Sequence, residues 1–159
     1  MLELKNVSKF YYNKGVIATG FSKVNLKLDI GEFIAITGES GSGKSTLLNV
    51  ISGLDTYEEG EMYVNGEETS HYNEEDYEEY RKKYIGNIFQ SFNLVNSYTV
   101  YQNVELVLLI NGETRRSVKH KVIDILKKVD LYKYRHTKVS KLSGGMKQRV
   151  AIARCLAKD

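Results

Sequence analysis

The sequence predicts an α/β fold that begins with antiparallel strands and continues into a strand, a glycine-rich loop and helices. Three patterns support this prediction. Residues 1–30 alternate apolar and polar side chains, residues 33–37 form a short apolar, β-branched run before a cluster of glycines, and residues 100–129 repeat apolar residues at helical spacing. With 159 residues, of which 42% are hydrophobic, the chain can bury a core of useful size.

The first thirty residues have the two-residue period of strands with one solvent-facing side. We therefore expect two antiparallel strands before the glycine-rich loop. The apolar positions of this pattern are Leu2, Leu4 and Val7, followed by Val24, Leu26, Leu28 and Ile30.

A short buried strand is predicted at 33–37, and the run Gly38–Thr46 directly after it matches G-x-x-x-x-G-K-[ST]. Glycines in this loop permit positive φ and let backbone N–H groups approach phosphate oxygens without a Cβ in the way. The motif therefore predicts a P-loop that binds a nucleoside triphosphate. The predicted cofactor contacts are Gly38, Ser40, Gly41, Ser42, Gly43, Lys44, Ser45 and Thr46.

Two side chains of the motif have separate predicted roles. Lys44 is expected to reach the β- and γ-phosphates of ATP and to take part in catalysis, and the Ser45 hydroxyl is expected to bind Mg²⁺. A helix over 44–52 would direct its positive dipole end at the phosphates. Apolar residues at helical spacing favour that helix, and Gly53 is suited to end it. These apolar residues are Leu47, Leu48 and Ile51.

The remaining elements follow from local patterns. A strand is expected at 61–64 before the hairpin turn Asn65-Gly66, and a short strand at 85–89 before Gln90. Residues 73–84 begin acidic and end basic, which suits a helix dipole. Further helices are predicted at 100–110 and 115–129, separated by Asn111-Gly112.

Charge and cysteine usage restrict the function classes. The formal net charge of +3 gives little reason to expect a nucleic-acid partner. The single Cys155 cannot form an internal disulfide, and the N-terminus lacks the apolar segment of a signal peptide, which together predict a cytoplasmic protein. The apolar cluster at 104–110 is far shorter than a membrane span.

A second motif stands near the end of the sequence, where Leu142-Ser143-Gly144-Gly145 leads into an amphipathic helix. Ser143 can cap that helix, and the two glycines leave backbone N–H groups accessible to a phosphate. Together with the P-loop, this motif resembles the LSGGQ signature of ATP-binding-cassette (ABC) transporter nucleotide-binding domains.

The resemblance implies how the two motifs work together. In the family, two such domains form a nucleotide-dependent head-to-tail dimer, so Ser143, Gly144 and Gly145 would contact ATP in trans. It also implies that Gln90 is the Q-loop residue, which contacts Mg²⁺ and the attacking water and therefore has a catalytic role. Tyr11 would be the aromatic residue that stacks on adenine.

The runs Leu47–Asp55 and Tyr101–Glu105 further resemble the lipoprotein-releasing, macrolide-exporter and cell-division branch of the family. The implied function is an ATP-binding subunit that powers export or substrate extraction through a separate membrane permease. Such a subunit would lie in the cytoplasm, peripheral on the inner face of the cell membrane.

The sequence departs from the family pattern at Met146 and Val139, and it stops at Asp159, before the Walker B strand of the family. We therefore expect a fragment with an incomplete central sheet that hydrolyses ATP poorly or not at all. The expected parts are a P-loop core with the β subdomain (1–90), a helical subdomain (91–145) and the start of the signature helix (146–159).

An alternative is a non-hydrolysing ATP-sensing or interaction module. Robust Mg-ATP binding without turnover would favour this alternative over a transport ATPase. A DNA-repair or chromosome-structuring cassette fits less well, since residues 44–143 contain neither coiled-coil heptads nor paired cysteines.

Overall fold

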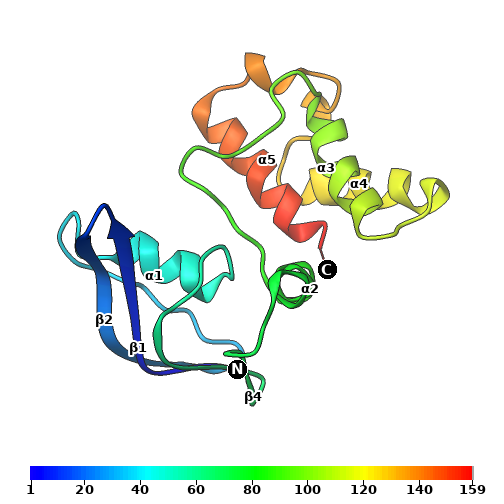
Figure 1. Cartoon of the computed structure of the whole chain (residues 1–159). Helices are drawn as coiled ribbons and strands as arrows, with labels where there is room; N and C mark the ends of the chain where they lie inside the picture. Colours follow the sequence, from blue (N-terminus) through cyan, green and yellow to red (C-terminus); the bar gives the residue numbers. More distant parts are fainter. Residues whose placement is uncertain (159) are drawn as a thin grey trace. The chain divides into compact units, whose positions relative to one another are not determined.

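A computed structural model describes residues 1–158 of the chain. They form two compact units, the first comprising Met1–Arg81 and the second beginning at Lys82. Figure 1 colours the elements along the sequence, and each unit is described by itself. None of the helices in the described residues has the length and apolar character that crossing a bilayer requires.

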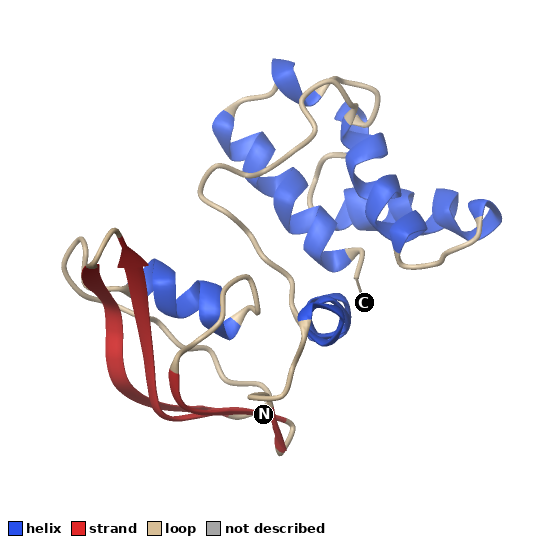
Figure 2. Cartoon of the chain, viewed as in Figure 1, coloured by secondary structure: helices blue, strands red, loops and turns tan. Residues whose placement is uncertain are grey.

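The first unit contains an antiparallel sheet, drawn in red in Figure 2, with the strand order β2-β1-β3-β4. The predicted N-terminal pair is confirmed, because β1 and β2 form one long antiparallel ladder. The predicted hairpin at Asn65-Gly66 is also confirmed, since β3 pairs with β4 and both turn residues have positive φ. The strands are β1 (Leu2–Asn13), β2 (Val16–Leu28), β3 (Glu59–Val64) and β4 (Glu67–Glu68).

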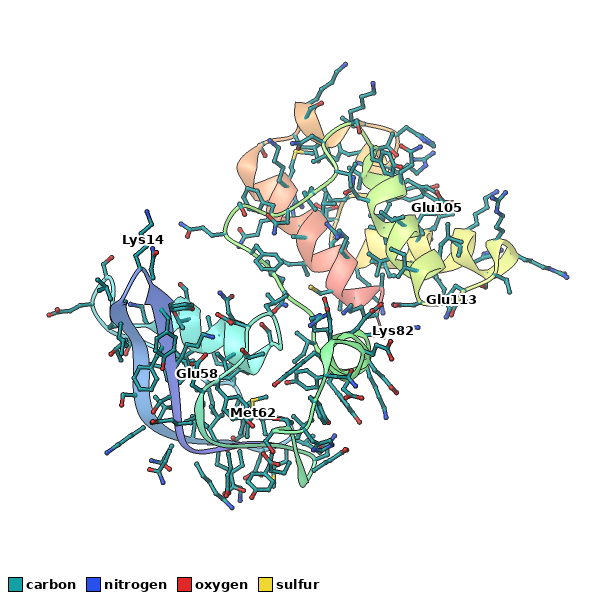
Figure 3. All side chains as sticks on the ribbon, viewed as in Figure 1. Lys14, Glu58, Met62, Lys82, Glu105 and Glu113 are labelled. Atoms are coloured by element: carbon teal, nitrogen blue, oxygen red, sulfur yellow. The ribbon has the colours of Figure 1, made fainter. Side chains whose placement is uncertain are left out.

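Helix α1 (Lys44–Ile51) packs on the sheet of the first unit, where Figure 1 shows the long strands curving around it. Its buried residues are Leu47 and Val50. The apolar face therefore differs from the predicted one, since Leu48 is 52% exposed. Met62 of β3, labelled in Figure 3, is fully buried in the same unit. The predicted stop at Gly53 is confirmed by its φ of +66°.

Helix α2 (Glu74–Tyr84) spans the boundary between the units and begins where the acidic residues predicted it. Asn73 caps it, because its Oδ1 accepts hydrogen bonds from the backbone N–H groups of Glu75 and Asp76. The Tyr80 hydroxyl donates to the Ile51 carbonyl oxygen at 2.6 Å, which joins α2 to the end of α1.

The second unit is helical and has its own core. It contains α3 (Val100–Ile110), α4 (Arg115–Lys128), α5 (Gly144–Leu156) and two 3₁₀ turns, η1 (Tyr132–Tyr134) and η2 (Val139–Lys141). The predicted helices at 100–110 and 115–129 are confirmed to within one residue. Their apolar stripes meet α5 in one cluster, formed by Val100, Val104, Leu108, Val118, Val122, Ile125, Leu126, Leu131, Val139, Leu142, Val150, Ala153 and Ala157.

Two predicted strands, at 33–37 and 85–89, are wrong as secondary structure, because neither forms a ladder within residues 1–158. An isolated apolar run cannot satisfy its backbone groups as a strand without a neighbouring strand. Phe33 is 99% exposed and Ile34 is 45% exposed, so the described residues do not bury these two side chains.

Candidate nucleotide-binding site

The glycine-rich loop precedes α1 with the backbone that the motif requires. Gly38, Gly41 and Gly43 have φ values of +150°, +82° and +89°, in the region that glycine adopts without strain. Gly43 is the N-terminal cap of α1 in the left-handed conformation. The loop therefore delivers the chain directly into the first turn of the helix.

Gly43 also approaches the sheet very closely. A Cβ on Gly43 would lie only 2.1 Å from the carbonyl oxygen of Gly20, a residue in the middle of β2. A side chain at Gly20 would in turn lie 2.8 Å from Cγ2 of Thr46. The two glycines thus let the start of α1 rest against the backbone of β2, and they fix the position of the loop.

Lys44 points back into its own loop. Its Nζ donates to the carbonyl oxygens of Gly38, at 2.9 Å, and Glu39, and to the Ser42 hydroxyl at 3.3 Å. These are all oxygen acceptors, the same kind of partner that phosphate oxygens would offer. The ammonium group is therefore already directed to the centre of the loop.

The first turn of α1 presents donors beside this ammonium group. The backbone N–H groups of residues 44–46 precede the first intrahelical bond, which Leu47 N–H makes to the Gly43 carbonyl at 2.8 Å. Ser45 is exposed at this turn and Thr46 is half-buried. Peptide donors, a helix dipole and a lysine therefore converge on one position, which suits a polyanion.

Tyr11 of β1 lies next to the same region. Its Cε2 is 3.1 Å from the Cβ position of Gly20, the glycine that also contacts Thr46. The Tyr11 side chain is 40% exposed, and its hydroxyl donates to Asp55 Oδ2 at 3.0 Å. The structure thus brings the predicted base-stacking residue and the P-loop together in the first unit.

Sequence reasoning missed a charged cluster beside Tyr11. Lys9, only 5% exposed, forms ion pairs with Asp55 at 2.9 Å and Glu58 at 3.0 Å. Burial alone would lower the pKa of Lys9, but the hydrogen bonds and charges of both carboxylates outweigh it and raise that pKa. Burial opposes the charged form of Asp55 as well, yet Lys9 and Tyr11 hold the pKa of Asp55 below its usual value.

Gln90 lies in the second unit, on an exposed turn. The residues that follow it, Phe92 and Asn93, have positive φ values of 63° and 45°. Helix α5 holds this segment, because Arg154 donates to the Asn93 carbonyl oxygen at 2.6 Å. The role of Gln90 towards Mg²⁺ and water stays a prediction.

The second motif also lies in the second unit. Ser143 caps α5, as predicted, although its Oγ accepts from the Met146 N–H at a long 3.4 Å. Gly144 and Gly145 lie in the first turn of α5 without a positive φ, and a Cβ on either would meet nothing within 4 Å. The described fold therefore gives no internal reason for glycine at these two positions.

Curated proteins that bind ATP are similar to this chain in sequence. The chain is 46% identical over 157 residues to a methionine import ATP-binding protein MetN of Clostridium acetobutylicum, covering 99% of this chain and 48% of that protein. It is 40% identical over 136 residues to a lipoprotein-releasing system ATP-binding protein LolD of Treponema denticola, covering 86% and 60%. The chain thus spans about half of the first relative's length and about three fifths of the second's.

Solved structures confirm the fold class and, with the family profile, the family. The ATP-binding cassette MJ0796, solved as a dimer bound to ADP and Pi, aligns with a TM-score of 0.90 at 40% identity over 99% of this chain and 70% of that one. MJ0796 is a protein of Methanocaldococcus jannaschii and is named an ABC transporter ATP-binding protein. The cbiO1 protein of Clostridium perfringens, part of a cbiONQ transporter complex, aligns with a TM-score of 0.84 at 26% identity, over 99% and 61%. Since residues 21–159 also match the profile of the ABC transporter family, the chain belongs to that family.

Proposed function

We propose that this chain binds Mg-ATP at the P-loop and serves as the ATP-binding subunit of an ABC transporter. The observation that best supports this proposal is the geometry where the loop meets α1. There Gly43, at φ +89°, lies against Gly20, and the Lys44 side chain points into the loop. Phosphate oxygens of a bound triphosphate would accept the hydrogen bonds that the Lys44 ammonium group donates to Gly38, Glu39 and Ser42 in this structure.

The donor set fits ATP and its metal ion. Backbone N–H groups and Lys44 suit phosphate oxygens, while the hydroxyl of Ser45 is a neutral oxygen ligand of the kind that would bind Mg²⁺ beside phosphates. When bound, Mg²⁺ neutralises charge on the phosphates. Lys44 would hold the transferred phosphate, and the proposed role of Gln90 towards Mg²⁺ and the attacking water rests on its match to the Q-loop glutamine of the family.

We further propose that Ser143, Gly144 and Gly145 complete the ATP site of a second copy in a head-to-tail dimer. Glycine within a helix lowers stability by roughly 0.5–1 kcal/mol relative to alanine. Within the described residues, no atom lies close enough to Gly144 or Gly145 to require glycine there, so nothing compensates for this loss of stability. An approaching phosphate from another subunit explains why side chains are absent here.

In the proposed cycle, ATP joins two subunits and hydrolysis releases them, which moves an attached membrane permease. The subunit would work in the cytoplasm, on the inner face of the membrane. The resemblance of Leu47–Asp55 and Tyr101–Glu105 to lipoprotein-releasing cassettes supports export or extraction as the direction, and the LolD relative agrees.

The methionine import relative supports the opposite direction, so import is the second candidate. The two differ in the permease that the subunit binds. Affinity purification of the subunit from its own cells, followed by mass spectrometry, would identify that permease. A permease with a large extracytoplasmic domain supports export or extraction, and one that pairs with an external binding protein supports import.

Isothermal titration with Mg-ATP tests the central proposal. We expect Lys44→Ala to weaken binding at least about tenfold, since charge-assisted phosphate contacts each contribute more than about 1.4 kcal/mol. Lys14→Ala is the matched control, because Lys14 is an exposed lysine in the turn between β1 and β2 (Figure 3). Equal Mg-ATP affinity in the wild type and Lys44→Ala would contradict the proposal.

A further inference from the structure

Tyr11 is fixed at two points by residues outside the P-loop. Its hydroxyl donates to Asp55 Oδ2 at 3.0 Å, and the Lys9 ammonium lies 5.1 Å from the centre of its ring. The second contact is within cation–π range and covers one face of the ring. The ring therefore has a defined orientation although 40% of the side chain is exposed.

The two groups that hold Tyr11 are themselves held. Asp55 and Glu58 both bind the buried Lys9, at 2.9 and 3.0 Å, so the cation cannot move without breaking two ion pairs. Glu58 also accepts a hydrogen bond from the backbone N–H of Phe10 at 2.7 Å, directly beside Tyr11. The cluster thus connects the Tyr11 segment of β1 to the segment that follows α1.

We propose that Asp55, with Lys9, is a positioning residue that holds the Tyr11 ring ready to stack on the base of a nucleotide bound in the P-loop. The inference rests on the proposed function and adds to it a source of base affinity. Fixing a rotatable side chain before binding removes part of the entropy loss that stacking would otherwise entail. Asp55 itself does not touch the nucleotide.

A positioning role predicts different effects on the binding of ATP and of tripolyphosphate. Tripolyphosphate can occupy the P-loop but offers no base to Tyr11, whereas ATP offers both. Loss of the contact between Tyr11 and Asp55 should therefore weaken ATP binding and leave tripolyphosphate binding unchanged. Pure stacking without positioning predicts no effect of Tyr11→Phe, because phenylalanine keeps the aromatic face.

The experiment is titration of the full chain with Mg-ATP and, separately, with Mg-tripolyphosphate. We expect Tyr11→Phe and Asp55→Ala each to weaken ATP binding by roughly two- to tenfold relative to tripolyphosphate. The double variant should bind ATP no more weakly than the Asp55→Ala variant, since Asp55→Ala already removes the contact that Tyr11→Phe breaks, together with the ion pair to Lys9. Tyr12→Phe, a change in the adjacent exposed tyrosine, is the matched control.

The outcomes separate the two proposals. If ATP and tripolyphosphate bind but their affinity ratio is the same in all variants, the positioning role is wrong and ATP binding stands. An equal loss for both ligands also overturns the positioning role, because the cluster would then act on the loop. If neither ligand binds the wild type, the proposed function fails, and this inference fails with it.

Discussion

The carbonyl oxygen of Gly20 occupies the space that a side chain on Gly43 would need, 2.1 Å from its Cβ position. Because that oxygen belongs to the backbone of β2, it cannot move aside as a flexible side chain could. We predict that Gly43→Ala displaces the P-loop from the sheet and lowers the free energy of unfolding by more than about 2 kcal/mol. Urea denaturation followed by circular dichroism measures this change.

Gly41→Ala is the internal control for this clash. Gly41 also has a positive φ, +82°, but a Cβ there would meet nothing within 4 Å. Its substitution should therefore show only the backbone strain of a left-handed residue, about 1–2 kcal/mol. Equal destabilisation by both variants would mean that the approach of Gly43 to Gly20 has no energetic consequence.

Lys9 should stabilise the first unit over a defined pH window. At neutral pH we expect Lys9→Met to lower the free energy of unfolding by about 1–3 kcal/mol, because Asp55 and Glu58 would face each other without a cation. The expected loss is below that of a fully buried pair, since the two carboxylate side chains are 28% and 29% exposed. Lys27→Met is the control, because Lys27 and its partner Asp29 are both more than half exposed.

The sign of the pH dependence follows from the two shifted groups. The pKa of Asp55 lies below its usual 3.8, so its contribution is present above that pH and is lost as the pH falls through the folded-state value. The pKa of Lys9 lies above its usual 10.5, so its contribution is present below that pH and is lost as the pH rises through the folded-state value. The stability difference between wild type and Lys9→Met should be flat from about pH 5 to pH 9 and shrink on both sides. A difference that stays constant down to about pH 2 would contradict this assignment.

Local signals in the sequence were enough to predict most elements of the fold. Helical periodicity predicted α3 and α4, alternation predicted β1 and β2, and the Asn65-Gly66 turn predicted the hairpin of β3 and β4. Local patterns could not decide whether residues 33–37 form a strand. Apolar composition indicates burial, but a ladder also needs a neighbouring strand, and within residues 1–158 that run has none.

For the candidate site, the motif predicted the loop and its lysine but not the structure that supports them. Gly20 was a usable signal, since a glycine inside a strand pattern often marks a close backbone approach. The cluster of Lys9, Asp55 and Glu58 had no such signal. Asp55 and Glu58 lie 46 and 49 positions after Lys9 in the sequence, and only the folded chain brings them together.

Asn103 shows how a position noted only for resemblance has a structural reason. It is 1% exposed, its Oδ1 accepts from Val95 N–H at 3.0 Å, and its Nδ2 donates to the carbonyl oxygens of Val95 and Thr99. Asn103→Leu leaves the Val95 N–H without an acceptor, whereas the carbonyl oxygens of Val95 and Thr99 keep backbone donors, so we predict a loss of about 1–3 kcal/mol in unfolding free energy. Gln102→Ala removes only the exposed bond from Thr99 N–H to the Gln102 side chain and keeps the other half of the capping box, so it should cost about 0.5–1 kcal/mol. Denaturant titration of both variants makes the comparison, and similar losses would show that Asn103 does not anchor the preceding loop.

Substitution of Gly145 should have opposite effects on the stability of the single chain and on formation of the proposed dimer. A Cβ at this position meets nothing within 4 Å, and alanine is the better helix former. Because Gly145 is in the first turn of α5, Gly145→Ala should raise the stability of the chain by less than the roughly 0.5–1 kcal/mol that is typical of a helix interior. The same methyl group would stand where a phosphate from the second subunit must approach, so dimer formation with Mg-ATP should weaken. Thermal unfolding without nucleotide and sedimentation velocity with and without Mg-ATP measure the two effects, and Gln148→Ala, an exposed change on the same helix, is the control. A Gly145→Ala chain that is less stable would assign the glycine to the fold of the chain itself, and a more stable chain with unchanged dimerisation would exclude a contact in trans.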